Sequence, residues 1–189
     1  YFVIGAALQG LGALAAIIVL VLRALGLEAI IGDAHLAALK KFFLAMACFW
    51  AYFTVVEFLT IFYGRHPAEM QVFWAKFTGP FRFSFWSMLT FCFFIPFPLL
   101  ALGKPSLDRA LLWAGISVNV GMWLERYCII VPSATRPFLP WGEGWYAPSW
   151  VEWSVTAAWC AGFVLVFLLF TRLFPILTLW ELTEEPHGP

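Results

Sequence analysis

Ionisable side chains inside long apolar runs are the residues of this sequence best suited to chemistry. Glu57 interrupts one such run, Glu125 and Arg126 are adjacent in another, and Glu152 stands near the start of a third. A charged side chain at the membrane centre costs about 2.5–3.5 kcal/mol on insertion scales, and such groups commonly mark paths for protons or substrates. They predict either proton transfer or a structural ion pair within a membrane.

Hydroxyl side chains follow the same pattern. Thr54, Glu57 and Thr60 are three residues apart and therefore share one helical face, and Ser87 belongs to a similar series in the next apolar run. These hydroxyls either make ordinary hydrogen bonds between helices, each worth about 0.6–2 kcal/mol, or line a path of hydroxyls and water. The predicted proton path consists of Glu57, Glu125, Arg126, Glu152, Thr54, Thr60 and Ser87.

Cysteine and histidine show no ligand pattern. The four cysteines are isolated in apolar stretches without zinc-ligand or haem-attachment spacing, so we interpret them as small apolar fillers. The three histidines lie in polar segments, whereas a haem held between helices needs imidazole at membrane depth. We therefore expect no metal and no cofactor on this chain, and no catalysis by it alone. The cysteines are Cys48, Cys92, Cys128 and Cys160.

Composition shows what kind of scaffold must hold these charges. The chain has 189 residues, of which 63% are hydrophobic and only 12% charged, with a formal net charge of zero. A soluble domain has about 25% charged residues and roughly 45–50% apolar ones. This composition excludes a nucleic-acid binder, a disordered tail and a secreted disulfide-rich miniprotein. It predicts a protein that crosses a membrane several times.

Five apolar stretches have the roughly 20 residues that a helix needs to span a bilayer. They do not alternate apolar and polar residues, so they predict helices and not a β-barrel. We expect an all-α transmembrane bundle that forms a single domain over residues 1–189. A helix over 66–77 is predicted to lie in the membrane interface, and Pro96 and Pro98 to kink or end the third span. The predicted spans are about 1–25, 42–63, 83–102, 110–131 and 150–173.

The direction of the spans brings the acids to one side of the membrane. The second and fourth spans end on the side where the fifth begins, so Glu57, Glu125 and Glu152 should share one leaflet. Arg126 should pair with Glu57 or Glu125. One arginine cannot neutralise three carboxylates, so at least one glutamate should exchange protons near neutrality. The alternatives are a structural lock between two helices and, for Glu152, a place among the lipid headgroups.

Basic residues give the orientation of the chain. Six lie on the side of the C-terminus and five on the other, which places the C-terminus in the cytoplasm by the positive-inside rule. The first group is Arg23, Lys40, Lys41, Lys104, Arg109 and Arg172, and the second is Arg65, Lys76, Arg82, Arg126 and Arg136.

Several strings resemble a known family. GMWLERYCIIVP at 121–132, PSWVEW at 148–153 and TRLFPILTLWE at 171–181 look like the end of a polysulfide-reductase membrane subunit of the NrfD/PsrC type. Within it, the ActC and ActF subunits of alternative complex III are the most similar, and YFVIGAALQGLGAL resembles the start of their sixth helix. The sequence begins with Tyr1 and not with Met. The resemblance implies that this chain is the second half of a longer one.

The resemblance also implies a function. Such a subunit binds no cofactor of its own in this half, anchors an iron–sulfur protein in the plasma membrane and handles quinol, mostly in the preceding half. Electrons pass to iron–sulfur clusters and haems of partner subunits, which include a cytochrome c subunit and a second NrfD-like subunit. By position, Glu57, Glu125 and Arg126 match polar residues of the second helical bundle, where a proton half-channel is expected.

Three functional hypotheses remain open on the sequence. The first is a subunit of a quinol-oxidising complex that moves protons through its buried acids. The second is a purely structural membrane anchor of such a complex. The third is a proton-coupled secondary transporter, which would show paired broken helices in related halves, whereas only the 83–102 stretch is visibly broken.

Overall fold

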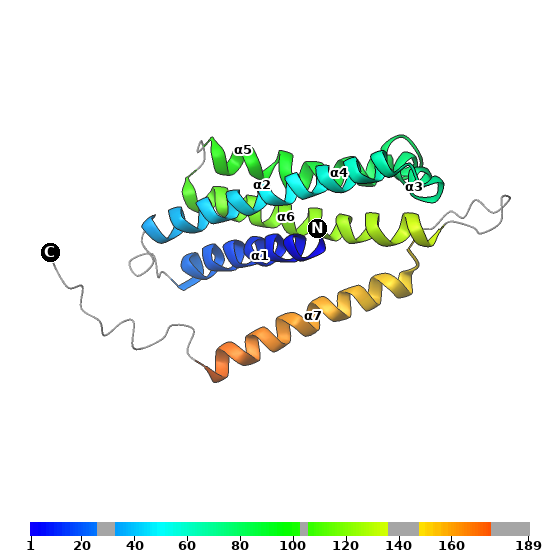
Figure 1. Ribbon diagram of the computed structural model, residues 1–189. Coiled ribbons are helices and arrows are strands. Elements are labelled where there is room, and N and C mark those ends of the chain that lie inside the picture. The colour runs from blue at the N-terminus through cyan, green and yellow to red at the C-terminus, as the bar shows by residue number, and fades with distance from the viewer. Residues whose placement is uncertain (26–32, 103–105, 136–147, 175–189) are drawn as a thin grey trace. The chain divides into compact units, whose positions relative to one another are not determined.

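The computed structural model describes residues 1–25, 33–102, 106–135 and 148–174, and every regular element in these ranges is helical (Figure 1). This confirms the predicted all-α class. The elements are α1 (Phe2–Leu25), α2 (Asp33–Gly64), α3 (Pro67–Phe77), α4 (Arg82–Leu89), the π-helical turn η2 (Thr90–Phe94), α5 (Pro96–Ala101), α6 (Leu107–Ala134) and α7 (Trp150–Leu173).

The chain divides into two compact units, residues 1–144 and 145–189. The first holds α1 to α6, and the second holds α7. The single domain predicted from the sequence stays a prediction.

Four helical segments of the described ranges are long and apolar enough to cross a membrane: Phe2–Ala24, Ala34–Gly64, Arg82–Ala101 and Trp150–Leu173. They match four of the five predicted spans. The fifth, 110–131, lies within α6, which has 28 residues but is not among the four. The physical reason is its polar content, since α6 carries Asn119, Glu125 and Arg126 among its apolar residues.

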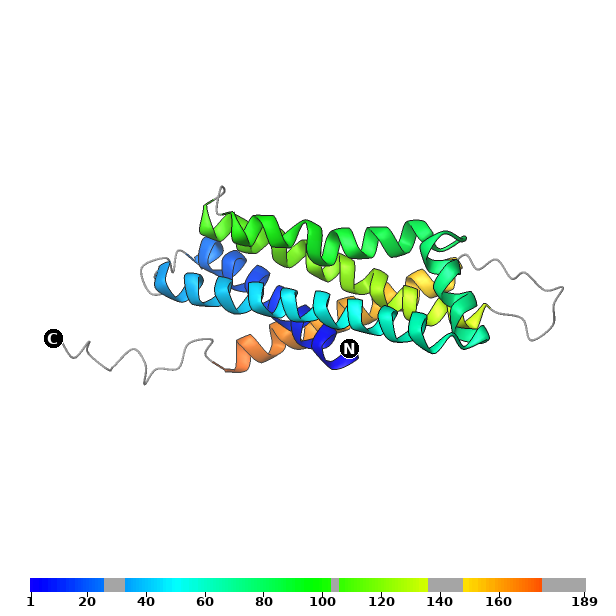
Figure 2. The ribbon, with the colours of Figure 1, turned by 45° about the horizontal axis from the view of Figure 1, so that its top comes forward.

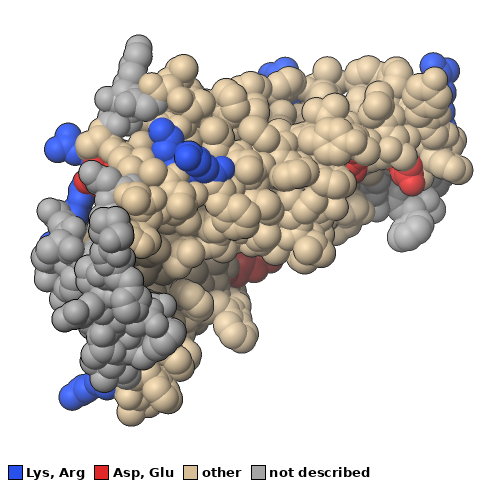
Figure 3. Space-filling model, turned by 60° about the vertical axis from the view of Figure 1, so that its left-hand side comes forward, with Lys and Arg blue, Asp and Glu red and all other residues tan. Residues whose placement is uncertain are grey.

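The polar helix α6 is the central element of the first unit. It packs against α1, α2, α3, α4, η2 and α5, and Figures 1 and 2 show α1 and the α4–α5 segment running alongside it. Its closest neighbour is α1, where Gly12 and Gly115 let the two backbones approach. The neighbouring helices therefore surround the side chains that lipid would exclude. By contrast, the visible face in Figure 3 is mostly free of charged residues.

Proline and a π-turn interrupt the 82–101 segment, as the two prolines predict. The Ile95 N–H donates to the Thr90 carbonyl at 2.9 Å, five residues back, and Pro96 has no N–H to offer. The Phe91 carbonyl is thereby released from the helical ladder. Ser117 of α6 donates its hydroxyl to this carbonyl at 2.8 Å, which satisfies it without water.

Helix α3 confirms the helix predicted for 66–77. It begins with Pro67, whose missing N–H costs nothing in a first helical turn. Its aromatic residues join those of α2 and α4: Phe73 stacks on Phe77 at 4.4 Å between ring centroids, and Phe58 meets Phe77 edge-on at 5.3 Å. This cluster holds α3 against α2 and α4.

Candidate functional site

Glu125 is the most enclosed charged residue of the described ranges, with no exposed surface. Trp50 of α2 donates its indole N–H to one carboxylate oxygen at 2.8 Å, and Arg126 donates to the other at 2.8 Å. Gly5 of α1 makes room for it, since a Cβ there would lie 3.1 and 3.3 Å from the two oxygens. Both oxygens of this buried carboxylate are therefore bound.

Arg126 pairs with its sequence neighbour and not with Glu57. Its side chain is 26% exposed, and its guanidinium also lies 4.2 Å from the centre of the Phe2 ring. The sequence left open whether Glu57 or Glu125 is its partner, and the geometry answers with Glu125. Because both residues belong to α6, this ion pair does not join two helices. The Trp50–Glu125 hydrogen bond is what joins α2 to α6.

Glu57 has a different environment. Its Oε2 is buried and has no hydrogen-bond partner. It lines a cavity of about 10 Å³ together with Glu125, so two of the three predicted acids do converge. A cavity needs roughly 10–15 Å³ and two to four polar partners to hold one water molecule. The cavity is lined by Tyr1, Glu57, Phe58, Lys76, Phe85, Met88, Glu125, Cys128 and Ile129.

Sequence reasoning missed two polar groups around these acids, Lys76 and Trp50. Lys76 comes from α3 and lines the cavity with Glu57, while its ammonium lies 5.7 Å from the centre of the Phe58 ring. Burial lowers the pKa of Lys76, and the nearby Glu57 carboxylate partly opposes this effect. The spacing of both residues could have indicated their position. Lys76 lies seven residues after Glu69 on α3, and Glu57 lies seven residues after Trp50 on α2, so each pair shares a helical face.

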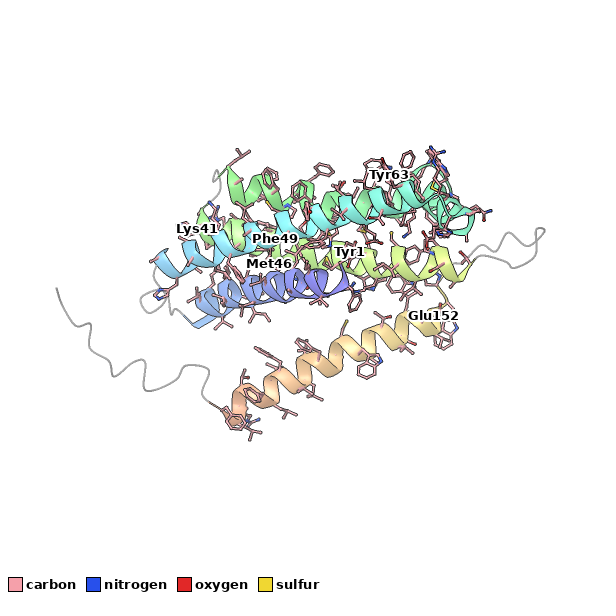
Figure 4. The ribbon with its side chains drawn as sticks, viewed as in Figure 1. Tyr1, Lys41, Met46, Phe49, Tyr63 and Glu152 are labelled. Carbon is pink, nitrogen blue, oxygen red and sulfur yellow. The ribbon has the colours of Figure 1, made fainter. Side chains whose placement is uncertain are left out.

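Tyr1 stands at the start of α1 (Figure 4) and completes the polar lining of the cavity. Its ring lies 6.4 Å from that of Trp50, measured between ring centroids. The cavity thus receives polar groups from α2, α3, α6 and the residue that precedes α1.

The hydroxyl residues of the predicted path do not line the cavity. Thr54 is buried and donates to the Trp50 carbonyl at 2.8 Å, and Thr60 is exposed and donates to the Val56 carbonyl at 2.8 Å. Ser87 lies half-buried on α4. Both threonine protons are used within α2, so neither forms the hydrogen bond between helices that the sequence offered as the structural alternative.

Glu152 belongs to the second unit and is not placed relative to the other acids. It stands in the first turn of α7 (Figure 4), where it forms a capping box with Ser149. The Ser149 N–H donates to Glu152 at 2.5 Å, and the Glu152 N–H donates to the Ser149 hydroxyl at 3.4 Å. The sequence Ser-x-x-Glu before an apolar run is the usual signature of this cap, so the role could have been predicted.

The described part of the chain holds no group of three or more His, Cys, Asp or Glu side chains that could bind a metal ion. Cys92 and Cys128 are buried, whereas Cys48 and Cys160 are exposed on their helices. No protein-family model matches the chain, and no curated protein matches it. The chemical interpretation of the site therefore rests on its own geometry.

Proposed function

We propose that this chain provides a proton path within an integral membrane subunit of a quinol-oxidising electron-transfer complex. The observation that carries the proposal is the cavity that Glu57 and Glu125 share inside the helical unit. Two carboxylates at such a site are costly unless they bind protons, cations or hydrogen-bond donors. Their presence there supports a proton-handling role.

The two glutamates have different parts in this proposal. Both Glu125 oxygens are already bound, by Trp50 and Arg126, so Glu125 serves as a fixed charge. The Glu57 Oε2 has no hydrogen-bond partner, and a proton on this oxygen would remove the cost of a buried, unpaired charge. Glu57 is therefore the residue that takes up and releases the proton, with Glu125 and Lys76 beside it.

The wider assignment comes from the resemblance to NrfD-type subunits, ActC and ActF among them. In it, the chain is the second half of a multi-pass protein of the plasma membrane with its C-terminus in the cytoplasm. It anchors an iron–sulfur subunit beside a cytochrome c subunit and a second NrfD-like subunit, which hold the clusters and haems. Quinol binds mostly in the preceding half, and this chain neither binds nucleic acid nor performs catalysis alone.

A purely structural anchor is the second candidate. The Trp50–Glu125 hydrogen bond favours it, because this bond joins α2 to α6 in the core of the unit. An anchor does not need Glu57, however, whose Oε2 has no partner to hold. A secondary transporter ranks third, because within the described ranges one π-helical interruption is seen, at η2.

The substitution Glu57→Gln tests the proposal in the assembled complex. We expect quinol oxidation and the accompanying proton release to fall by about 100-fold or more, with the complex still assembled, because the amide cannot carry a proton. Asp108→Asn is the matched control, since Asp108 lies at the first turn of α6 and pairs with Arg23 instead. Wild-type proton release in Glu57→Gln would contradict the proposal, and loss of assembly with normal residual turnover would favour the anchor.

A further inference from the structure

Helix α3 carries two charged residues on the face that packs against α2. Glu69, Val72, Phe73 and Lys76 follow the spacing of one helical face. All four line a hollow of about 130 Å³ between α2 and α3, together with Phe58 and Ile61 of α2. A helix that only lies in the membrane interface would turn its apolar residues inward and its charges outward. The inward face of α3 therefore needs an explanation other than membrane attachment.

This hollow adjoins the small cavity at Glu57. Phe58 and Lys76 line both spaces. The larger space has room for several water molecules, and the smaller one is at the limit for a single water. Glu69 is exposed, Lys76 is half-buried and the Glu57 Oε2 is fully buried, so the three residues mark increasing depth from the surface.

We propose that the α2–α3 hollow is the entrance through which protons reach Glu57, with Glu69 at its mouth and Lys76 as the carrier between the two spaces. The inference rests on the proposed function and adds where the proton enters. In the transfer, the Lys76 ammonium gives a proton to the Glu57 carboxylate, either directly or through one water. The neutral amine then regains a proton from hydronium in the outer hollow, which leaves water behind.

The groups that face Glu57 allow this transfer. Lys76 is the cation that α3 contributes, while α6 contributes Glu125 and Cys128, and Tyr1 precedes α1. Helix α4 adds Phe85 and Met88, which do not titrate. The lowered pKa of Lys76 brings its neutral form closer to working pH, as a proton carrier requires.

A neighbouring groove serves as an internal comparison. It has a volume of about 410 Å³, is lined mainly by apolar side chains such as Phe62 and Leu89, and holds no charged residue. Val55 of α2 lines it without touching the route described above. Thr54 lines this groove too, but its hydroxyl already donates to the Trp50 carbonyl. Filling the groove with a larger side chain should therefore leave proton exchange at Glu57 unchanged, whereas filling the α2–α3 hollow should slow it.

Hydrogen–deuterium exchange of the Glu57 carboxyl group tests the entrance. The full protein is reconstituted in lipid vesicles, and exchange is followed by infrared spectroscopy on the carboxyl band that disappears in Glu57→Gln. We expect Lys76→Met to lengthen the exchange half-time by about 100-fold and Lys76→Arg to do so as well, because guanidinium does not release a proton. Lys41→Met, on an exposed lysine near the start of α2 (Figure 4), should leave exchange unchanged.

A second test narrows the α2–α3 hollow with a larger apolar side chain and leaves every ionisable group in place. Val72→Trp narrows the outer space and should slow exchange, whereas Val55→Trp fills the apolar groove and should not. Wild-type exchange in both Lys76→Met and Val72→Trp would overturn the entrance, even if Glu57→Gln abolished proton-coupled turnover. Conversely, exchange at Glu57 can be measured whether or not turnover depends on Glu57. Failure of the proposed entrance can therefore be distinguished from failure of the proposed function.

Discussion

At the scale of single residues, Glu125 shows how a carboxylate is kept in an apolar interior. The backbone of Gly5 leaves space for it, Trp50 binds one oxygen and Arg126 the other. Charge-assisted hydrogen bonds of this kind are about twice as strong as neutral ones. Glu57 lines the same cavity but lacks such partners at Oε2. In the proposed function, Glu125 is therefore the fixed charge and Glu57 the acid that exchanges its proton.

Trp50→Phe tests the fixed charge. The ring still fills the core, but Glu125 loses one donor, so we expect a loss of about 1.5–3 kcal/mol of stability, the range for hydrogen bonds to charged groups. Thermal unfolding in detergent or lipid measures it. Trp113→Phe is the control, because Trp113 lies on the same helix as Glu125 and is 60% exposed. Equal stability of the two variants would mean that the indole N–H does not support Glu125.

Acid should weaken the contact between the ends of α1 and α6. The Ser106 hydroxyl and the Arg23 guanidinium hold the pKa of the Asp108 carboxyl well below its usual range. A lowered folded-state pKa stabilises the protein fully above the ordinary value of about 3.9 and loses this effect as pH falls toward the folded-state pKa. We expect Asp108→Asn to lower stability at pH 7 by up to about 1 kcal/mol, a small loss because the pair is partly exposed, and to remove this acid dependence from thermal unfolding. An unchanged pH profile would contradict the assignment.

At the scale of helices and turns, hydropathy predicted where helices lie better than where they begin. Predicted and observed bounds agree for Trp150–Leu173 and nearly so for Phe2–Leu25. Helix α2 begins at Asp33 and not near 42, because Ala, Leu and Lys make up most of residues 34–41 and favour a helix. Such residues extend a helix beyond the apolar stretch that a span needs.

Tertiary contacts explain what the sequence could not predict. The prolines predicted a break near 96, but the π-turn that precedes it depends on Ser117 of another helix, which satisfies the Phe91 carbonyl. Likewise, the inward position of Lys76 follows from the packing of α3 on α2 and α6. The acids themselves could be found because charge inside an apolar run is visible without any structure.

The crossing of α1 and α6 should be sensitive to a single methyl group. A Cβ on Gly115 would collide with the Gly12 carbonyl, so Gly115→Ala should cost about 1–3 kcal/mol of stability through overpacking. Gly10→Ala is the matched control, since a Cβ at Gly10 meets nothing within 4 Å. Its stability should equal or slightly exceed that of the wild type. If both variants unfold at the same temperature, the helices do not approach through these glycines.

At the scale of the whole molecule, the proposed path has a direction. Its polar groups gather where α2 ends and α3 begins, and the structure places Glu69, Lys76 and Glu57 in order of depth there. If the C-terminus is cytoplasmic and the chain spans the bilayer five times, this end of α2 faces the opposite side. Protons would then exchange with the extracytoplasmic side.

Reporter fusions test this orientation. We expect green fluorescent protein at the C-terminus to fluoresce and alkaline phosphatase there to be inactive, since the positive-inside rule places that end in the cytoplasm. The same reporters inserted between α2 and α3, after Gly64, should give the reverse result. Matching signals at both positions would contradict the predicted number of spans.

The protonation of Glu57 during turnover tests the central claim most directly. Infrared difference spectra of the working complex should show a carboxyl band that appears or shifts as quinol is oxidised and is absent in Glu57→Gln. The same band should persist in the control Asp108→Asn, because Asp108 lies in the first turn of α6 and does not line the cavity at Glu57. Turnover without any carboxyl change, or a band that survives in Glu57→Gln, would contradict proton transfer through this residue.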